Sequence, residues 1–325
     1  MDSKKIETWM AEKKIPGLSL AIIENAEVVV HLELGLKNAQ NKDPIVADTL
    51  FEAASLSKPV FAYGVLKLVE SDKLNLDTPL SEYLVYQDIK DDKRLEYITA
   101  RMVLAHSSGF PNWRPKTESL KIHFQPGERF SYSGEGFLYL QRVVEHLSGL
   151  SLEEYMVKNV FIPLGMNHST YKWVNNNEKA SGHDVDGHPI ESRKEIPQNA
   201  AFTLHTTSLD YAKFVIACLK DVGLKPETFI EMLKPQIVVH EGNSISWGLG
   251  WGLQRTTLDT SFWHWGDNEG FKSFVVGSKS RKQAIILFTN SSNGLSLISE
   301  VVQEYLGIPQ PAFKWLDEKN RTNSL

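Results

Sequence analysis

A serine and a lysine stand three residues apart in the segment FEAASLSKPVFAYGVLKLVE, residues 51–70. The serine is Ser55, the lysine is Lys58, and an almost unbroken apolar run follows them. Serine favours helix starts, and a proline such as Pro59 is tolerated only near a first helical turn. We therefore expect a buried helix that begins near Ser55, with Lys58 one turn on and facing the same way.

Burial would give this pair a chemical use. A buried lysine has a lowered pKa, and a partly neutral lysine can take a proton from a neighbouring hydroxyl. Ser55 would then be a nucleophile, and the N–H groups at the helix start would stabilise a developing oxyanion. The alternative is structural, with Ser55 as a helix cap and Lys58 as a side chain that reaches solvent. The two residues alone do not decide between these interpretations.

The same spacing occurs a second time, in Ser169-Thr170-Tyr171-Lys172. A turn-like stretch precedes Ser169, and the residues that follow it have no helical pattern. Residues three apart share a face on a helix but not on a strand. We therefore expect Ser169 and Lys172 to point apart and to have no joint chemical role.

Two later segments favour the interpretation of Ser55 as a nucleophile. Tyr132-Ser133-Gly134 stands at the entrance to a predicted helix, and His264-Trp265-Gly266 ends a predicted strand. With Ser55 and Lys58, these triplets resemble the serine β-lactamase and penicillin-binding-protein superfamily. The closer resemblance is to its class C β-lactamase-related branch, which includes β-lactamase-like esterases. That branch carries S-x-x-K, then Y-x-N or a relative, then K-T-G or H-x-G, in that order.

The resemblance covers nearly the whole chain, through five segments in the family's order. These are IPGLSLAIIENAEVV, FEAASLSK, MVLAHSSGFPNW, FIPLGMNHSTY and HWGDNEGFKS. It implies that Ser55 is the acylated nucleophile, Lys58 its base or proton relay, and Tyr132 a member of the same proton network. Beside a charged lysine, the Tyr132 phenol is expected to have a lowered pKa. The resemblance further implies that His264 lines the strand edge, with the backbone N–H groups of Ser55 and Asp267 as the oxyanion hole.

Further residues are candidates for substrate binding: Gly134, Trp265, Gly266 and Phe271. Gly266 would leave room for a substrate along the strand. Trp113 and Trp173 are candidates for a pocket wall, although aromatic residues usually belong to the core. Tyr132 could also be an ordinary interface tyrosine and His264 a strand histidine bonded to a carbonyl, while His106 is expected to support a loop.

The second motif departs from the family pattern because it ends in Gly134 rather than asparagine. In the family that asparagine helps to hold the amide side chain of a β-lactam or peptide. We therefore expect a carboxylesterase acting on small or medium esters. The alternatives are a D-amino-acid peptidase or weak β-lactamase, and a non-enzymatic penicillin-binding-like sensor or binding module.

Composition limits the other possibilities. The chain has 325 residues, 42% apolar and 23% charged, with a net charge of -5, as in a globular protein. It has no basic patch with interleaved aromatic residues, so nucleic acid is not an expected partner. The single cysteine, Cys218, lies in an apolar run and is expected in the core. We expect no metal and no cofactor, and a small-molecule ester, amide or β-lactam as substrate; the sequence does not predict an oligomeric state.

The sequence gives little evidence for a metal site, a membrane span or a targeting signal. Asp184, Asp186 and Gly187 faintly suggest a calcium loop, but an Asp-Gly hairpin turn fits better. No run of about 18 apolar residues occurs, so no membrane span is expected. The N-terminus has no signal peptide, which predicts a cytoplasmic protein if the chain is full length and an exported one if a leader was trimmed.

These residues need a scaffold, and the apolar spacing predicts an α+β fold of the β-lactamase and DD-peptidase type. A helix over residues 3–13 and a hairpin of residues 18–24 and 28–34 open the chain, and strands at 261–266, 273–278 and 284–290 lie near its end. We expect one domain over residues 1–325. Its sheet subdomain comprises residues 1–60 and 235–325, and its mostly helical subdomain comprises residues 61–234. A helix at 208–220 is expected to be capped by Ser208, and the polar tail at 313–325 to fray.

Overall fold

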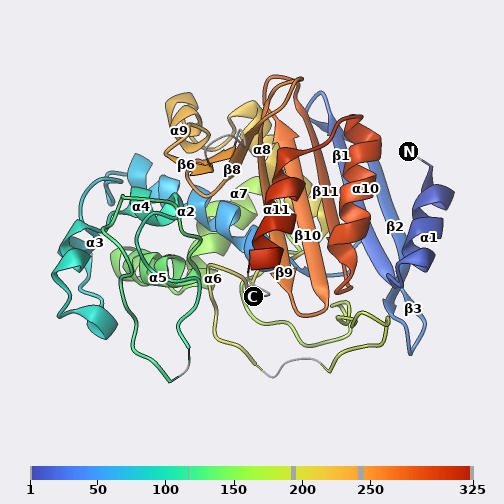
Figure 1. Ribbon diagram of the computed structural model, residues 1–325, viewed down its shortest axis with the longest axis horizontal. Coiled ribbons are helices and arrows are strands. Elements are labelled where there is room, and N and C mark those ends of the chain that lie inside the picture. Colours follow the sequence, from blue (N-terminus) through green and yellow to red (C-terminus); the bar gives the residue numbers. More distant parts are fainter. Residues whose placement is uncertain (1, 116, 192–194, 241–244, 323–325) are drawn as a thin grey trace.

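The computed structural model describes residues 2–115, 117–191, 195–240 and 245–322 of the chain. A wide antiparallel sheet occupies one side of the molecule, and a group of helices occupies the other (Figure 1). This arrangement confirms the predicted α+β fold class.

Residues from both ends of the chain build the main sheet. Its strand order is β3-β2-β1-β11-β10-β9-β8-β7-β6, and β1 pairs with β11 from Leu18 opposite Thr289 to Ile23 opposite Ala284. The strands are β1 Gly17–Glu24, β2 Glu27–Asn38, β3 Asp43–Pro44, β6 Ile237–His240, β7 Ile245–Trp247, β8 Gly252–Arg255, β9 Thr260–Asn268, β10 Phe271–Ser278 and β11 Gln283–Thr289. The predicted hairpin and the three predicted C-terminal strands are therefore confirmed.

Both faces of this sheet are covered. Leu18, Leu20 and Ile22 of β1 belong to an apolar cluster shared with α1 (Ser3–Glu12), α10 (Gly294–Leu306) and α11 (Pro311–Thr322). The alternate residues Ala21 and Ile23 join a second cluster, which contains α8 (Ser208–Lys220) and the helical region. Successive strand side chains point to opposite faces, so β1 buries both.

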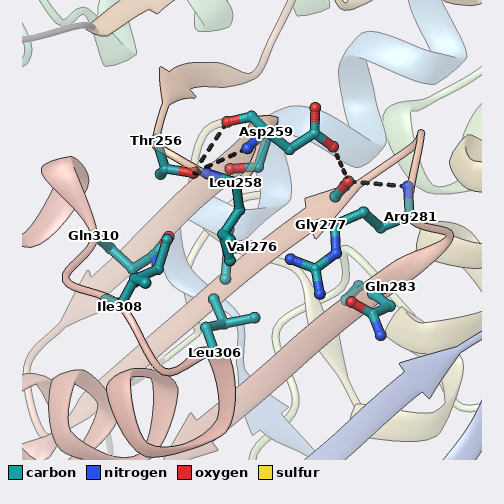
Figure 2. Close-up of a pocket in the computed structure, with 13 residues that line it drawn as sticks. Thr256, Leu258, Asp259, Val276, Gly277, Arg281, Gln283, Leu306, Ile308 and Gln310 are labelled. Atoms are coloured by element: carbon teal, nitrogen blue, oxygen red, sulfur yellow. Dashed lines mark hydrogen bonds between the residues drawn. The ribbon is translucent and has the colours of Figure 1, made fainter.

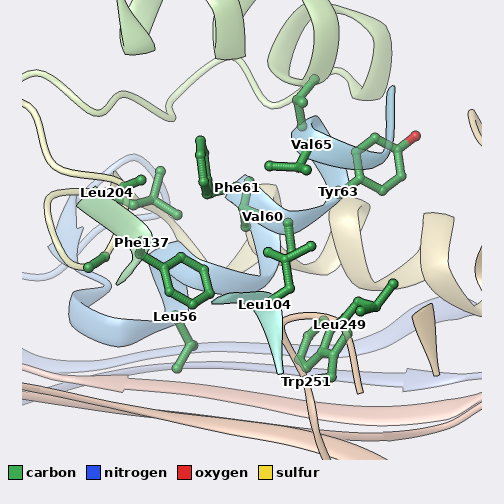
Figure 3. Close-up of a cluster of buried hydrophobic side chains, with 14 of the residues drawn as sticks. Leu56, Val60, Phe61, Tyr63, Val65, Leu104, Phe137, Leu204, Leu249 and Trp251 are labelled. Carbon is green, nitrogen blue, oxygen red and sulfur yellow. The ribbon is translucent and has the colours of Figure 1, made fainter. Parts of the chain in front are cut away.

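The helical region forms around one buried helix, α2 (Ser57–Glu70). Figure 3 shows its side chains Val60, Phe61 and Val65 among residues from several other segments. The remaining α-helices are α3 Leu80–Tyr83, α4 Ala100–Leu104, α5 Gly134–Ser148, α6 Leu152–Met156, α7 Ile162–Leu164 and α9 Pro226–Met232. Short helical turns are η1 Ala54–Leu56, η2 Gln87–Ile89, η3 Lys93–Tyr97 and η4 Val157–Phe161, and a two-stranded sheet pairs β4 (Phe51–Glu52) with β5 (His205–Thr206).

Two local predictions are wrong. The capping residue of α8 is Thr207, whose side chain accepts from the Asp210 N–H, rather than Ser208. The tail does not fray from residue 313, because α11 continues to Thr322 and buries Trp315 and Leu316. Its apolar residues recur at helical spacing, and packing on the sheet outweighs its polar composition.

The segment around Asp184 forms a turn, as predicted. The Asp184 carboxylate accepts the backbone N–H groups of Asp186 and His188, and Gly187 has φ of +83°. Across the described ranges, no group of three or more His, Cys, Asp or Glu side chains is arranged to hold a metal ion. No helix in the same ranges is long and apolar enough to cross a membrane.

Candidate active site

Ser55 lies in a tight turn directly before α2. From residue 49 to residue 66, Ser55 is the one residue that is not buried. It belongs to η1, and the N-cap residue of α2 is Leu56, so Ser55 does not hold the capping position of α2 that the structural alternative gave it. Side chains three apart lie one above the other in such a turn, which aligns Ser55 with Lys58.

Lys58 is buried, with 1% of its surface exposed, and its amine contacts Ser55 directly. The Lys58 Nζ lies 2.9 Å from the Ser55 Oγ and donates to the Ala201 carbonyl at 2.9 Å. It also lies over the Tyr132 ring, 4.7 Å from the centroid. The Lys58 amine therefore does not reach solvent. In its neutral form, the amine in this pairing matches the arrangement expected of a nucleophile and its proton acceptor.

The residue before Ser55 has a strained backbone. Ala54 has φ of +50°, in the left-handed region that residues with a side chain rarely adopt. Hydrogen bonds hold the turn, because Ser57 Oγ donates to the Ala54 carbonyl and Ser273 Oγ donates to the Ala53 carbonyl. Strain of this kind persists only when surrounding contacts enforce it, and it concentrates at functional sites.

Tyr132 is buried beside this pair. Burial raises the pKa of the Tyr132 phenol above its usual value, while a hydrogen bond with Ser55 acts in the opposite direction. The predicted lowering of this pKa is therefore wrong, because loss of hydration outweighs the neighbouring groups. Tyr132 is neutral in this structure and is able to donate a proton.

His106 packs against the ring of Tyr132. The two rings stack with centroids 4.2 Å apart, and the His106 Nδ1 accepts the Ser133 backbone N–H at 3.0 Å. His106 is fully buried. It therefore positions the second motif, in keeping with its predicted structural role.

His264 is fully buried as well. Its Nδ1 lies 2.7 Å from the Trp265 carbonyl, and its ring centroid lies 6.1 Å from that of Tyr132. The pairing of β8 with β9 runs from Thr260 to Trp263, so His264 begins the part of β9 beyond β8. The structure thus brings His264 to Tyr132.

Gly266 allows the strand to approach the nucleophile turn. A Cβ built on Gly266 would lie 2.3 Å from the Ala53 carbonyl oxygen and 3.1 Å from the Ala54 Cβ. The missing side chain therefore leaves room for the turn itself, and contact of Gly266 with a substrate remains a prediction. This contact places Asp267, the next residue, close to the segment that carries Ser55.

Two predicted substrate contacts are largely buried. Trp265 is 8% exposed and packs on Tyr132 with ring centroids 4.8 Å apart. Phe271 is 2% exposed and lines a hollow with Glu52 and Lys179. Direct contact of either ring with substrate remains a prediction, limited to a small exposed edge.

The second serine–lysine pair has separate partners. Ser169 Oγ lies 2.8 Å from Thr206 Oγ1 and donates to an Asp210 carboxylate oxygen at 3.1 Å. Ser169 is therefore part of a buried polar contact between β5 and α8, as its non-helical context indicates.

Sequence reasoning missed a buried ionic contact near the turn. Lys179 Nζ donates to Glu52 at 2.7 Å, and Asn268 Nδ2 donates to the other Glu52 oxygen at 2.8 Å. Glu52 lies three residues before Ser55, and Asn268 directly follows Asp267. A charged residue inside the apolar stretch before Ser55 was the available signal.

Another cavity lies away from these residues. It is formed by the β8–β9 turn, β10, β11 and the segment after α10, and Figure 2 shows Leu258, Val276 and Leu306 among its lining side chains. None of the predicted site residues lines it.

The fold and the site together define a protein of the β-lactamase and DD-peptidase type. The sequence pattern of the Beta-lactamase family matches residues 3–298, and the chain belongs to that family.

Known proteins share this likeness at low identity. "Protein flp" of Staphylococcus aureus strain N315 is 23% identical over 313 residues, covering 88% of this chain and 62% of its own length. The chain thus spans about three-fifths of that curated relative. Among solved structures, the octameric penicillin-binding protein homologue from Pyrococcus abyssi has a TM-score of 0.79 at 25% identity, covering 96% of this chain and 78% of its own. The D-alanine carboxypeptidase AmpC from Burkholderia cenocepacia has a TM-score of 0.78 at 18% identity, covering 91% and 95%.

Proposed function

We propose that this chain is a serine hydrolase that forms an acyl-enzyme on Ser55 and acts on small or medium carboxylic esters. The observation that carries the proposal is the contact of 2.9 Å between the partly exposed Ser55 hydroxyl and the buried Lys58 amine. Ser55 is therefore within reach of a substrate, while the lysine is shielded from water. Membership of the Beta-lactamase family supports the same chemistry.

The proposed reaction has two halves. Lys58 accepts the Ser55 proton as the Oγ–carbon bond forms, and the backbone N–H groups of Ser55 and Asp267 stabilise the carbonyl oxygen as it becomes negative. Neutral Tyr132 passes a proton to the departing alcohol and regains one from Lys58. Water then gives a proton to Lys58 as it attacks the acyl-enzyme, the acyl–Oγ bond breaks to release the carboxylic acid, and Ser55 takes that proton from Lys58. His264 acts in this proposal by holding Tyr132.

The preference for esters rests on Gly134, which has no side chain to hold a substrate amide. An unpaired buried carbonyl costs about 1–3 kcal/mol, or about one to two decades in rate. An ester with a good leaving group depends less on this contact. The peptidase and β-lactamase alternatives are therefore disfavoured.

A substrate panel with covalent labelling tests this proposal. We expect turnover of p-nitrophenyl acetate and butyrate, weak or no turnover of nitrocefin and D-alanyl peptides, and a fluorophosphonate label on Ser55 by mass spectrometry. Ser55→Ala should abolish both turnover and labelling, whereas the control Ser169→Ala should retain the Ser55 label. Faster turnover of nitrocefin than of p-nitrophenyl acetate would favour the β-lactamase alternative. Absence of both turnover and label would favour a binding module.

A further inference from the structure

The space next to Gly134 is already filled. A Cβ built on Gly134 would lie 2.5 Å from two indole carbons of Trp113 and 2.8 Å from the Asn112 carbonyl oxygen. The benzo ring of Trp113 therefore lies against the start of α5, where an asparagine side chain would project in the family pattern. The missing amide is replaced by an aromatic surface.

Hydrogen bonds on both sides of Trp113 fix its loop. Gly134 N–H donates to the backbone and side-chain oxygens of Asn112 at 3.0 and 3.1 Å. On the other side, Arg114 donates to the buried carboxylate of Glu135 from its backbone N–H and its Nε, each at 3.1 Å. Trp113 nevertheless remains 43% exposed. A large aromatic side chain held rigidly while facing solvent loses little entropy when a ligand packs on it.

A second aromatic ring connects Trp113 with the nucleophile. Phe202 packs edge-on against Trp113, with ring centroids 5.5 Å apart. The residue before Phe202 is Ala201, whose carbonyl accepts the Lys58 amine at 2.9 Å. The two rings therefore extend from Gly134 of the second motif to the residue that follows Ala201, the residue whose carbonyl holds the Lys58 amine.

We infer that Trp113 is a specificity-determining residue that selects substrates with an aromatic or bulky apolar acyl group. This inference rests on the proposed function and narrows its substrate class. Apolar and aromatic groups gain from packing on the indole, whereas a carboxamide finds no donor at Gly134. A simple Gly134→Asn replacement should not restore amide recognition, because its Cβ would collide with both Trp113 and the Asn112 carbonyl.

The test compares two esters that differ in the acyl group. We expect kcat/KM for p-nitrophenyl phenylacetate to exceed that for p-nitrophenyl acetate, and Trp113→Ala to reduce this ratio about fivefold. Trp113→Phe should retain most of the ratio. The matched control is Trp9→Ala, which removes an indole from α1 and should leave the ratio unchanged.

A binding measurement separates this inference from the proposed function. In the Ser55→Ala variant, calorimetry should show tighter binding of phenylacetate than of acetate, and adding Trp113→Ala should remove the difference. If the wild-type protein hydrolyses no ester but this Trp113-dependent preference persists, the esterase proposal fails and the inference stands. An unchanged preference after Trp113→Ala, or no preference in Ser55→Ala, overturns the inference.

Discussion

The residues proposed to carry out the reaction at Ser55 differ in how far they are exposed to solvent. Ser55 is partly exposed, Lys58 is buried, and burial raises the pKa of the Tyr132 phenol. A phenol with a raised pKa keeps its proton near neutral pH and so is not a resident base, but it can still pass that proton to an alkoxide, which is a stronger base, once Lys58 has taken the Ser55 proton. We therefore assign Tyr132 to the proton-transfer step toward the leaving group.

This assignment predicts a severe effect of Tyr132→Phe, which removes just the hydroxyl. We expect kcat to fall by about two decades or more, since positioned acid–base groups typically contribute that much. The matched control is Tyr139→Phe on α5, which removes a hydroxyl that donates to the Leu84 carbonyl at 2.7 Å. Steady-state kinetics with ethyl butyrate, whose alkoxide leaving group needs a proton, should show near-normal kcat for the control. Near-normal turnover by Tyr132→Phe would make Tyr132 a structural residue.

Among the elements, the short strand β4 has an effect out of proportion to its length. Its Glu52 accepts a hydrogen bond from Lys179 on one carboxylate oxygen and from Asn268 on the other. These bonds hold the segment that precedes Ser55 against the end of β9. Both Glu52 and Lys179 are less than 10% exposed. Removing one member of a buried pair leaves an uncompensated charge, which is far costlier than losing an exposed pair.

Lys179→Met should therefore lower the free energy of unfolding by about 3–5 kcal/mol in urea titrations. The double variant Lys179→Met with Glu52→Gln should recover much of this loss, because glutamine can still accept from Asn268 without a buried charge. Lys14→Met, which breaks the exposed pair of Lys14 and Asp186, should cost far less, because water screens the two charges. Equal losses for Lys179→Met and Lys14→Met would contradict the assigned role of the buried pair.

For the molecule as a whole, the site lies where the helical region meets the sheet, and β5 contributes a buried histidine there. Burial, together with the Lys179 charge, lowers the pKa of His205 to about 3. The ordinary pKa of histidine is about 6.5, so between these values the unfolded chain binds a proton that the folded chain does not. The stability from neutral His205 is thus complete above about pH 6.5 and decreases as the pH falls toward 3.

Unfolding free energies should consequently decrease by about 1.4 kcal/mol per pH unit below pH 6 through His205 alone. His205→Gln should remove this part of the slope, even if it also changes the stability at neutral pH. The control His188→Gln alters an exposed histidine and should preserve the slope. Urea titrations at pH 7.5, 6.5 and 5.5 measure the difference, and identical slopes for the wild type and His205→Gln would refute the prediction.

Local sequence patterns were sufficient for much of this protein. Strand alternation and helical spacing predicted the terminal hairpin, the C-terminal strands and the buried helix after Ser55, because these periodicities follow directly from backbone geometry. The spacing of Ser55 and Lys58 likewise predicted their contact. The tail was mispredicted because its few apolar residues become decisive once a sheet face exists to receive them.

Other features depended on contacts between distant segments. The raised pKa of Tyr132 follows from burial by several segments, and the ionic contact of Glu52 joins residues 127 positions apart along the chain. The meaning of Gly134 also changed: its sequence shows a missing side chain, whereas the fold places Trp113 in that space. Residue type and local spacing were enough to propose the chemistry. Burial and the packing of remote segments, which only the tertiary structure decides, set the protonation states and the shape of the site.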